Sequence, residues 1–342
     1  MNTIRIFELK ISFRFIVLAL LFNSMSHGQS TMQTDSTLNN LAHPKWYKSI
    51  ELNSIPEYKK YGDKKVTLLL ISGWGMPSSI WNGFIEKNKN TYTIYNIALP
   101  GFEGTVAPEI PEEGTDYSKK IWTKSAMNGI VKLIKQDNLE NVFVIAHFIT
   151  ATQVGFELSI NYPELIGGFI SVGGPIKFIH SNPQYASMTP EMRAISVTKG
   201  MAQQWFKTIS EDVWDENNFK EEFYSSDQKS AKKLWDDVAK VDLPIMIQYI
   251  CEYYASDPKE YYSKLTIPTL ALIPSFNEEI MSKVDDPNYN FIKPQFYDSW
   301  HNAQKINSKI NVEIIPDSHF AIMLDNPKLF EQKIKSFIKA NS

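Results

Sequence analysis

The stretch "NVFVIAHFITATQVGFELSINYP", residues 141–163, decides the fold. Residues 141–147 form a short, almost continuously apolar run, which is typical of a strand buried on both faces of a parallel sheet. Residues 151–163 follow a helical pattern that ends at Pro163, because proline cannot continue a helix. The sequence therefore predicts a strand, a sharp turn and a helix, with Phe148 at the tip of the turn.

The same alternation of strand and helix extends on both sides of this stretch. Short apolar runs that end at glycine or proline predict further strands, and apolar residues at helical spacing predict the intervening helices. The predicted strands are residues 64–75, 92–105 and 166–174, and the predicted helices are residues 76–88 and 116–136. This alternation indicates an α/β protein with a mostly parallel central sheet and helices on both faces.

The pattern changes between residues 177 and 264, where no strand signal occurs and aromatic and charged residues recur at helical spacing. Strands are predicted again at residues 265–274 and 308–316, followed by a closing helix at residues 327–340. We therefore predict three parts after residue 28: a first core part at 29–176, a helical cap at 177–264 and a second core part at 265–342. The cap carries six prominent aromatic residues: Trp205, Phe206, Trp214, Phe219, Phe223 and Trp235.

Composition narrows the classes of function. The chain has 342 residues and a formal net charge of −3, so it offers no basic surface that would indicate nucleic-acid binding. Its single cysteine, Cys251, excludes an internal disulfide and a zinc site built from cysteines, and we interpret it as a small buried hydrophobe. No metal-ligand spacing or phosphate-binding loop is present, and "DDPNYN", residues 285–290, predicts a turn. We expect no cofactor.

Residues 1–28 have the pattern of a secretory signal peptide. The apolar run at 15–22 is too short to span a bilayer comfortably, and Ser26 and Gly28 are the small residues expected before a cut at Gln29. Three basic residues precede or open the apolar run: Arg5, Lys10 and Arg14. We predict a secreted or periplasmic protein with no membrane span after cleavage; the alternative is an uncleaved anchor.

Four short stretches carry a resemblance to a known family. They are "SGWGMPSSIW" at 72–81, "LPGFEGT" at 99–105, "AHFITA" at 146–151 and "IPDSHFAIMLDNP" at 315–327. In this order, within residues 64–340, they resemble the α/β-hydrolase fold family, and in particular the cap-bearing bacterial esterases, epoxide hydrolases and haloperoxidases. The resemblance implies an oxyanion loop, a Pro-Gly turn, a nucleophile turn and a loop that carries a catalytic histidine.

The nucleophile turn departs from the family pattern. Working members have Gly-x-Ser-x-Gly, whereas Ala146, Phe148 and Thr150 stand here at the first glycine, the serine and the second glycine. Phenylalanine has no lone pair with which to attack a carbonyl, so no acyl-enzyme can form at this position. Loss of the nucleophile in a serine protease lowers turnover by about 2 × 10⁶.

The other catalytic positions are partly kept. The resemblance places His319 at the catalytic histidine and Asn277 at the acid position, where Glu278 is a possible substitute. An amide cannot stabilise an imidazolium as a carboxylate does, and this exchange costs about 10⁴ in turnover in a serine protease. Histidines 180 and 301 are interpreted as cap or surface residues.

The resemblance also implies an oxyanion hole made by the backbone N–H groups of Trp74 and Ile149. These donors do not depend on side-chain identity, so a polarising pocket can persist without a serine. Two hydroxyls nearby are alternative nucleophiles. Ser72 replaces the usual histidine of the oxyanion loop, and Thr150 is expected to face away from the pocket.

Three hypotheses for function remain open. The first is a secreted homologue that has lost serine-hydrolase catalysis, a pseudoenzyme, and binds a small apolar or aromatic ligand, or a partner, between core and cap. The second is an active hydrolase of an ester, amide or epoxide that uses His319 in an atypical arrangement. The third is a non-hydrolytic enzyme, such as a lyase or a cofactor-free oxygenase, in which His319 is the base.

Overall fold

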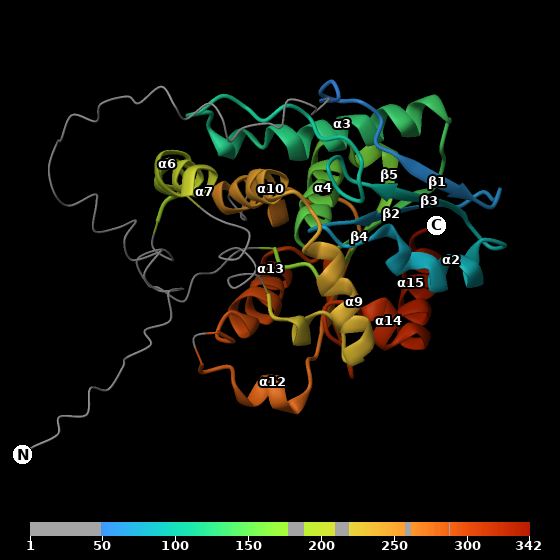
Figure 1. Cartoon of the computed structure of the whole chain (residues 1–342). Helices are drawn as coiled ribbons and strands as arrows, with labels where there is room; N and C mark the ends of the chain where they lie inside the picture. Colours follow the sequence, from blue (N-terminus) through green and yellow to red (C-terminus); the bar gives the residue numbers. More distant parts are fainter. Residues whose placement is uncertain (1–48, 177–187, 209–218, 257–260, 287) are drawn as a thin grey trace, which may run out of the picture.

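The computed structural model describes residues 49–176, 188–208, 219–256, 261–286 and 288–342 (Figure 1). The predicted signal peptide, His180 and Trp214 lie outside these residues. Within the described residues, no helix is both long enough and apolar enough to cross a membrane.

The centre of the molecule is a seven-stranded sheet with the order β1-β3-β2-β4-β5-β6-β7. All pairs of neighbouring strands are parallel except β1 and β3, which are antiparallel. The strands are β1 (Tyr58–Tyr61), β2 (Thr67–Ser72), β3 (Thr93–Ala98), β4 (Val142–His147), β5 (Ile166–Val172), β6 (Thr269–Pro274) and β7 (Ile310–Ile315). The predicted mostly parallel sheet is confirmed, and each of the six predicted strands is present. Only β1 was not predicted.

Burial explains why the inner strands could be predicted from the sequence. Every residue of β2, β4 and β6 is buried, because helices cover both faces of the sheet. In Figure 1, α3 (Ile121–Gln136) and α4 (Phe148–Asn161) lie on one side of the sheet, and α2 (Asn82–Asn88) and α15 (Pro327–Asn341) lie on the other. The predicted two-sided covering is therefore confirmed.

All described elements in the segment between β5 and β6, called here the β5–β6 insertion, are helical. They are α6 (Pro190–Ser196), η5 (Val197–Met201), α7 (Ala202–Thr208), η6 (Glu221–Phe223), α9 (Gln228–Val238) and α10 (Leu243–Ala255). The remaining short elements are η2 (Ser78–Trp81), η3 (Tyr117–Lys119), η4 (Pro163–Leu165), α12 (Glu278–Ser282), η7 (Lys293–Asp298), α13 (Ser299–Ile306) and α14 (Ile322–Asp325). The three helices between β6 and β7 were not predicted from sequence.

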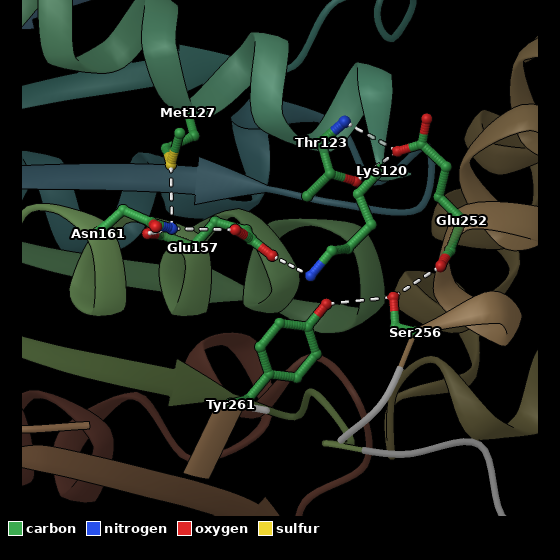
Figure 2. Close-up of polar contacts among 8 residues, drawn as sticks. All are labelled: Lys120, Thr123, Met127, Glu157, Asn161, Glu252, Ser256 and Tyr261. Atoms are coloured by element: carbon green, nitrogen blue, oxygen red, sulfur yellow. Dashed lines mark hydrogen bonds and ion pairs between the residues drawn. The ribbon is translucent and has the colours of Figure 1, made fainter. Parts of the chain in front are cut away.

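Helix α10 of the insertion is fastened to the core by a buried carboxylate (Figure 2). Glu252 is fully buried and accepts hydrogen bonds from the backbone N–H of Trp122 at 2.8 Å and of Thr123 at 2.9 Å. These N–H groups belong to the first turn of α3, which has no intrahelical acceptor for them. The hydroxyl of Thr123 donates to the same carboxylate at 2.7 Å. Burial raises the pKa of Glu252, while these hydrogen bonds act in the opposite direction.

A buried ion pair lies beside this contact (Figure 2). The ammonium of Lys120 lies 2.5 Å from the Glu157 carboxylate of α4, and 4.8 Å above the ring of Tyr261. The Tyr261 hydroxyl donates to Ser256, whose carbonyl accepts from buried Arg193 of α6 at 2.9 Å. Polar contacts therefore link α3, α4, α6 and α10 at the junction of the core and the insertion.

We expect Glu252→Ala to destabilise the whole protein by about 3 kcal/mol, because it leaves buried amide and hydroxyl donors of α3 without an acceptor. Urea unfolding followed by circular dichroism measures this change. The matched control is Glu279→Ala, which removes an exposed carboxylate paired with Lys283 and should cost less than about 0.5 kcal/mol. Equal losses in the two variants would contradict a fastening role for Glu252.

Candidate functional site

The predicted strand, turn and helix meet at Phe148. Strand β4 ends at His147, α4 begins at Phe148, and the backbone at Phe148 is left-handed with a φ of +67°. This conformation costs a bulky residue roughly 1–2 kcal/mol and is found where the surrounding structure fixes it. The turn also approaches the loop after β2 closely, since a Cβ added to Gly73 would lie 2.4 Å from the Ala151 nitrogen. The backbone thus has the sharp turn that presents a side chain at the end of a strand.

The side chain presented by this turn is a packed ring. Phe148 is fully buried, and its ring centroid lies 4.4 Å from that of Phe320 and 5.5 Å from that of Phe219. Phe219 belongs to the insertion, whereas Phe320 follows the predicted catalytic histidine. Carbon and hydrogen atoms therefore occupy the position at which the resemblance predicts a reacting oxygen.

Phe148 is part of a larger aromatic cluster that joins the sheet to the insertion. The centre of this cluster is Phe320, whose ring lies within 6.0 Å of six other aromatic rings. These rings belong to Phe148, Phe219, Phe223, Tyr224, Phe276 and Phe296. Of the aromatic residues singled out in the predicted cap, Phe219 and Phe223 therefore contact the core at the candidate site.

His319 lies beside this cluster and is 98% buried, with 2% of its surface exposed. Its Nδ1 lies 2.7 Å from the backbone carbonyl of Glu222 in η6. A carbonyl oxygen only accepts, so Nδ1 carries the proton and donates. Its Nε2 has no hydrogen-bond partner among the described residues. In the neutral ring this nitrogen is a buried acceptor, and leaving such a group unpaired costs about 1–3 kcal/mol.

The backbone of the His319 loop is also held in place. The N–H of His319 donates to the Asp325 carboxylate at 2.8 Å, and the same carboxylate accepts from the Ser225 hydroxyl at 2.5 Å. The N–H of Phe320 donates to the carbonyl of Phe223 at 3.0 Å. The histidine loop and the residues that follow η6 are therefore hydrogen-bonded together. The Glu222 carbonyl was not found from sequence, because a backbone acceptor leaves no side-chain pattern. Asp325 lies within the quoted segment 315–327, but no role was predicted for it.

The predicted acid position has a structural role here. The side chain of Asn277 accepts from the N–H of Ile280 at 2.8 Å and so caps the N-terminus of α12. Asn277 and Glu278 are both exposed, and no described hydrogen bond joins either of them to His319. The partner of Nδ1 is instead a carbonyl of the insertion.

The predicted oxyanion donor at Trp74 is already engaged. Its N–H donates to the hydroxyl of Thr150 at 2.7 Å, and both residues are buried. The side chain of Thr150 thus contacts the loop after β2, and that it faces away from the pocket stays a prediction. The hydroxyl of Ser72 accepts from the Trp81 indole at 3.0 Å. The second predicted donor, Ile149, is buried in the first turn of α4.

A second buried histidine lies at the turn itself. The Nε2 of His147 lies 2.9 Å from the Phe320 carbonyl and therefore donates, while its Nδ1 has no partner among the described residues. Burial lowers the pKa of His147 from 6.5 to about 4. The neutral ring thus helps to hold the loop that carries His319 against the end of β4.

Comparisons with known proteins give one curated relative and many similar structures. No family model matches the chain. The chain is 23% identical over 289 residues to the pimeloyl-[acyl-carrier protein] methyl ester esterase of Wigglesworthia glossinidia brevipalpis, covering 81% of this chain and 95% of the relative. Within the described part of the chain, no three His, Cys, Asp or Glu side chains group as a metal site requires.

Among solved structures, a hydrolase from Oleispira antarctica matches with a TM-score of 0.62 at 13% identity, over 86% of this chain and 100% of that one. A thermophilic esterase from Thermogutta terrifontis matches with a TM-score of 0.61 at 14% identity, over 84% and 94%. A bromoperoxidase from Bacillus anthracis matches with a TM-score of 0.56 at 16% identity, over 82% and 94%. At such identities the likeness concerns the fold.

We expect Thr150→Val to lower stability by about 1–2 kcal/mol, because it removes the buried acceptor of the Trp74 N–H while keeping the shape of the side chain. Urea unfolding measures the loss. The control is Thr91→Val at an exposed position, where the change should stay within about 0.5 kcal/mol. A neutral Thr150→Val would show that the Trp74 N–H finds another acceptor.

The lowered pKa of His147 predicts a pH-dependent stability. The folded state disfavours the charged ring, so this contribution is complete above pH 6.5 and is lost as the pH falls toward 4. The loss for the wild type should reach about 3 kcal/mol over this window. His147→Gln should remove this component, which urea titrations at pH 7, about 5.5 and about 4 measure. Identical pH profiles in both proteins would refute it.

Proposed function

Taking the α/β-hydrolase fold as given, we propose that this protein has lost serine-hydrolase catalysis and binds a small apolar or aromatic ligand between the sheet and the β5–β6 insertion. The observation that carries the proposal is the fully buried ring of Phe148 at the left-handed turn. A nucleophile at that position is what the covalent chemistry of serine hydrolases requires.

The neighbouring groups support the loss of catalysis. The two nearby hydroxyls that were alternative nucleophiles, Ser72 and Thr150, each accept a hydrogen bond from a buried donor. The Trp74 N–H donates to Thr150, so it is not directed at the position of a developing oxyanion. Neither Asn277 nor Glu278 has a described hydrogen bond to His319.

Ligand binding is supported by the chemistry of the surfaces that meet at the site. Aromatic side chains come from both sides of the junction, with Phe148 and Phe320 in the core and Phe219 in the insertion. Small-molecule sites are lined mainly by apolar and aromatic side chains with a few polar groups. Buried His319 supplies such a polar group next to these rings.

The second candidate function is hydrolysis of an ester, amide or epoxide by an atypical arrangement. The observation in its favour is His319, whose Nδ1 is fixed by the Glu222 carbonyl so that Nε2 is available as a base. Esters are included among the substrates of this alternative because the curated relative is a methyl ester esterase. In this alternative, the attacking water or other nucleophile would bind at Nε2 of His319 during the reaction.

Export is part of the same proposal. The pattern of residues 1–28 supports a secreted or periplasmic protein whose mature chain begins at Gln29. Mass determination of the exported protein gives its first residue.

We expect a fluorophosphonate probe to leave the purified protein unlabelled, because Phe148 offers no atom that can be phosphonylated. Hydrolysis of p-nitrophenyl butyrate should be no faster with the wild type than with His319→Ala. Intact-protein mass spectrometry and absorbance at the nitrophenolate band measure the two results. Covalent labelling at a serine or threonine, or ester turnover abolished by His319→Ala, would instead support the hydrolase candidate.

A further inference from the structure

The hydrogen bonds of His319 restrict the chemistry of a ligand at this site. Its Nδ1 must donate, because its partner, the carbonyl of Glu222, accepts only. The neutral imidazole then presents an acceptor at Nε2, which is 98% buried with the rest of the residue and has no partner among the described residues. A buried acceptor of this kind is satisfied by a ligand that carries an O–H or N–H donor.

The surroundings of His319 restrict the rest of the ligand. The ring of Phe276 lies 5.6 Å from the imidazole, and Phe320 is the next residue in the chain. Phe219 extends the aromatic surface toward the insertion, and it is half-buried, whereas Phe148 and Phe320 are fully buried. The half-buried Phe219 is the more exposed edge of this aromatic surface, so a ligand ring is expected to contact it there in the edge or offset geometry that aromatic pairs prefer.

Two carboxylates belong to residues that contact His319, and both have described partners. The Asp325 carboxylate bonds the backbone of His319, and the Glu222 carboxylate accepts from the Tyr289 hydroxyl. Two lysines lie over the same tyrosine ring: Lys220 at 4.6 Å, which also donates to the hydroxyl, and Lys283 at 5.3 Å. A charged ligand would lose its hydration in this buried aromatic surrounding, so a neutral ligand is favoured.

We infer that the site takes a neutral aromatic molecule with a hydroxyl group, a phenol or an aromatic alcohol, whose O–H donates to Nε2 of His319. The inference rests on the proposed binding function, and it adds the chemical class of the ligand and the side chain that recognises it. The specificity comes from one hydrogen bond, because a site built to pair a hydroxyl rejects the analogue that lacks the donor.

Three naphthalene probes test the inference on the purified protein. 2-Naphthol carries the donor, 2-methoxynaphthalene has the same ring system with an acceptor oxygen only, and 2-naphthoate is an anion. Isothermal titration calorimetry should show 2-naphthol binding about tenfold more tightly than the ether, with the anion weakest. This comparison uses the wild type alone and does not depend on a variant that folds.

Two variants then locate the donor. His319→Phe keeps a ring and removes the acceptor, so both neutral probes should bind it equally. His301→Phe is the matched control, because His301 of α13 also bonds a backbone carbonyl through Nδ1, that of Tyr297 at 2.7 Å, but lies outside the site. It should keep the preference for 2-naphthol. Circular dichroism confirms that each variant is folded.

The outcomes separate this inference from the proposed function. Equal binding of 2-naphthol and the ether to the wild type would overturn the donor assignment and leave apolar binding intact. A preference for 2-naphthol that survives in His319→Phe, or tightest binding of the anion, would also overturn it. Absence of binding by all three probes would refute both the inference and the proposed binding function.

Discussion

The left-handed backbone at Phe148 is the constraint on which the rest of the site depends. The turn between β4 and α4 packs closely against the backbone at Gly73. This packing holds residue 148 in its left-handed conformation. The cost of this conformation, roughly 1–2 kcal/mol, is offset when the Phe148 ring is buried, a term of about 2–3 kcal/mol. At this turn the strained backbone holds the Phe148 ring within an aromatic core.

The aromatic cluster around Phe320 packs the junction between the sheet and the β5–β6 insertion. Helix α4, the loop that carries His319 and the β5–β6 insertion each contribute rings, so these three parts of the chain are positioned by one another. The polar groups at the same place are mostly satisfied internally, with Thr150 on Trp74 and Asp325 on Ser225. Two imidazole nitrogens at this place, Nε2 of His319 and Nδ1 of His147, have no partner among the described residues.

The buried strands could be predicted because short continuous apolar runs that end at glycine or proline are typical of a parallel sheet. The α/β-hydrolase fold was predicted from the resemblance of four short stretches to that family. Strand β1 was missed because "YKKY" is largely exposed at the edge of the sheet and lacks an apolar face. The contact of Thr150 with the Trp74 N–H was not predicted, because it depends on how closely the loop after β2 approaches the first turn of α4. The contact between His319 and the Glu222 carbonyl joins residues 97 positions apart and uses a backbone atom, so no local pattern announces it.

Glu252 has a consequence for how the molecule comes apart. Its carboxylate belongs to α10 of the insertion, while the amides that it satisfies begin α3 in the core. If α10 detached, the first backbone N–H groups of α3 would lose their acceptor. The neighbouring ion pair of Lys120 and Glu157 would become exposed. The insertion and the sheet are thereby coupled into a single cooperative unit, with few partly open states below global unfolding. A protease that cleaves only opened chains would therefore cleave such a protein slowly.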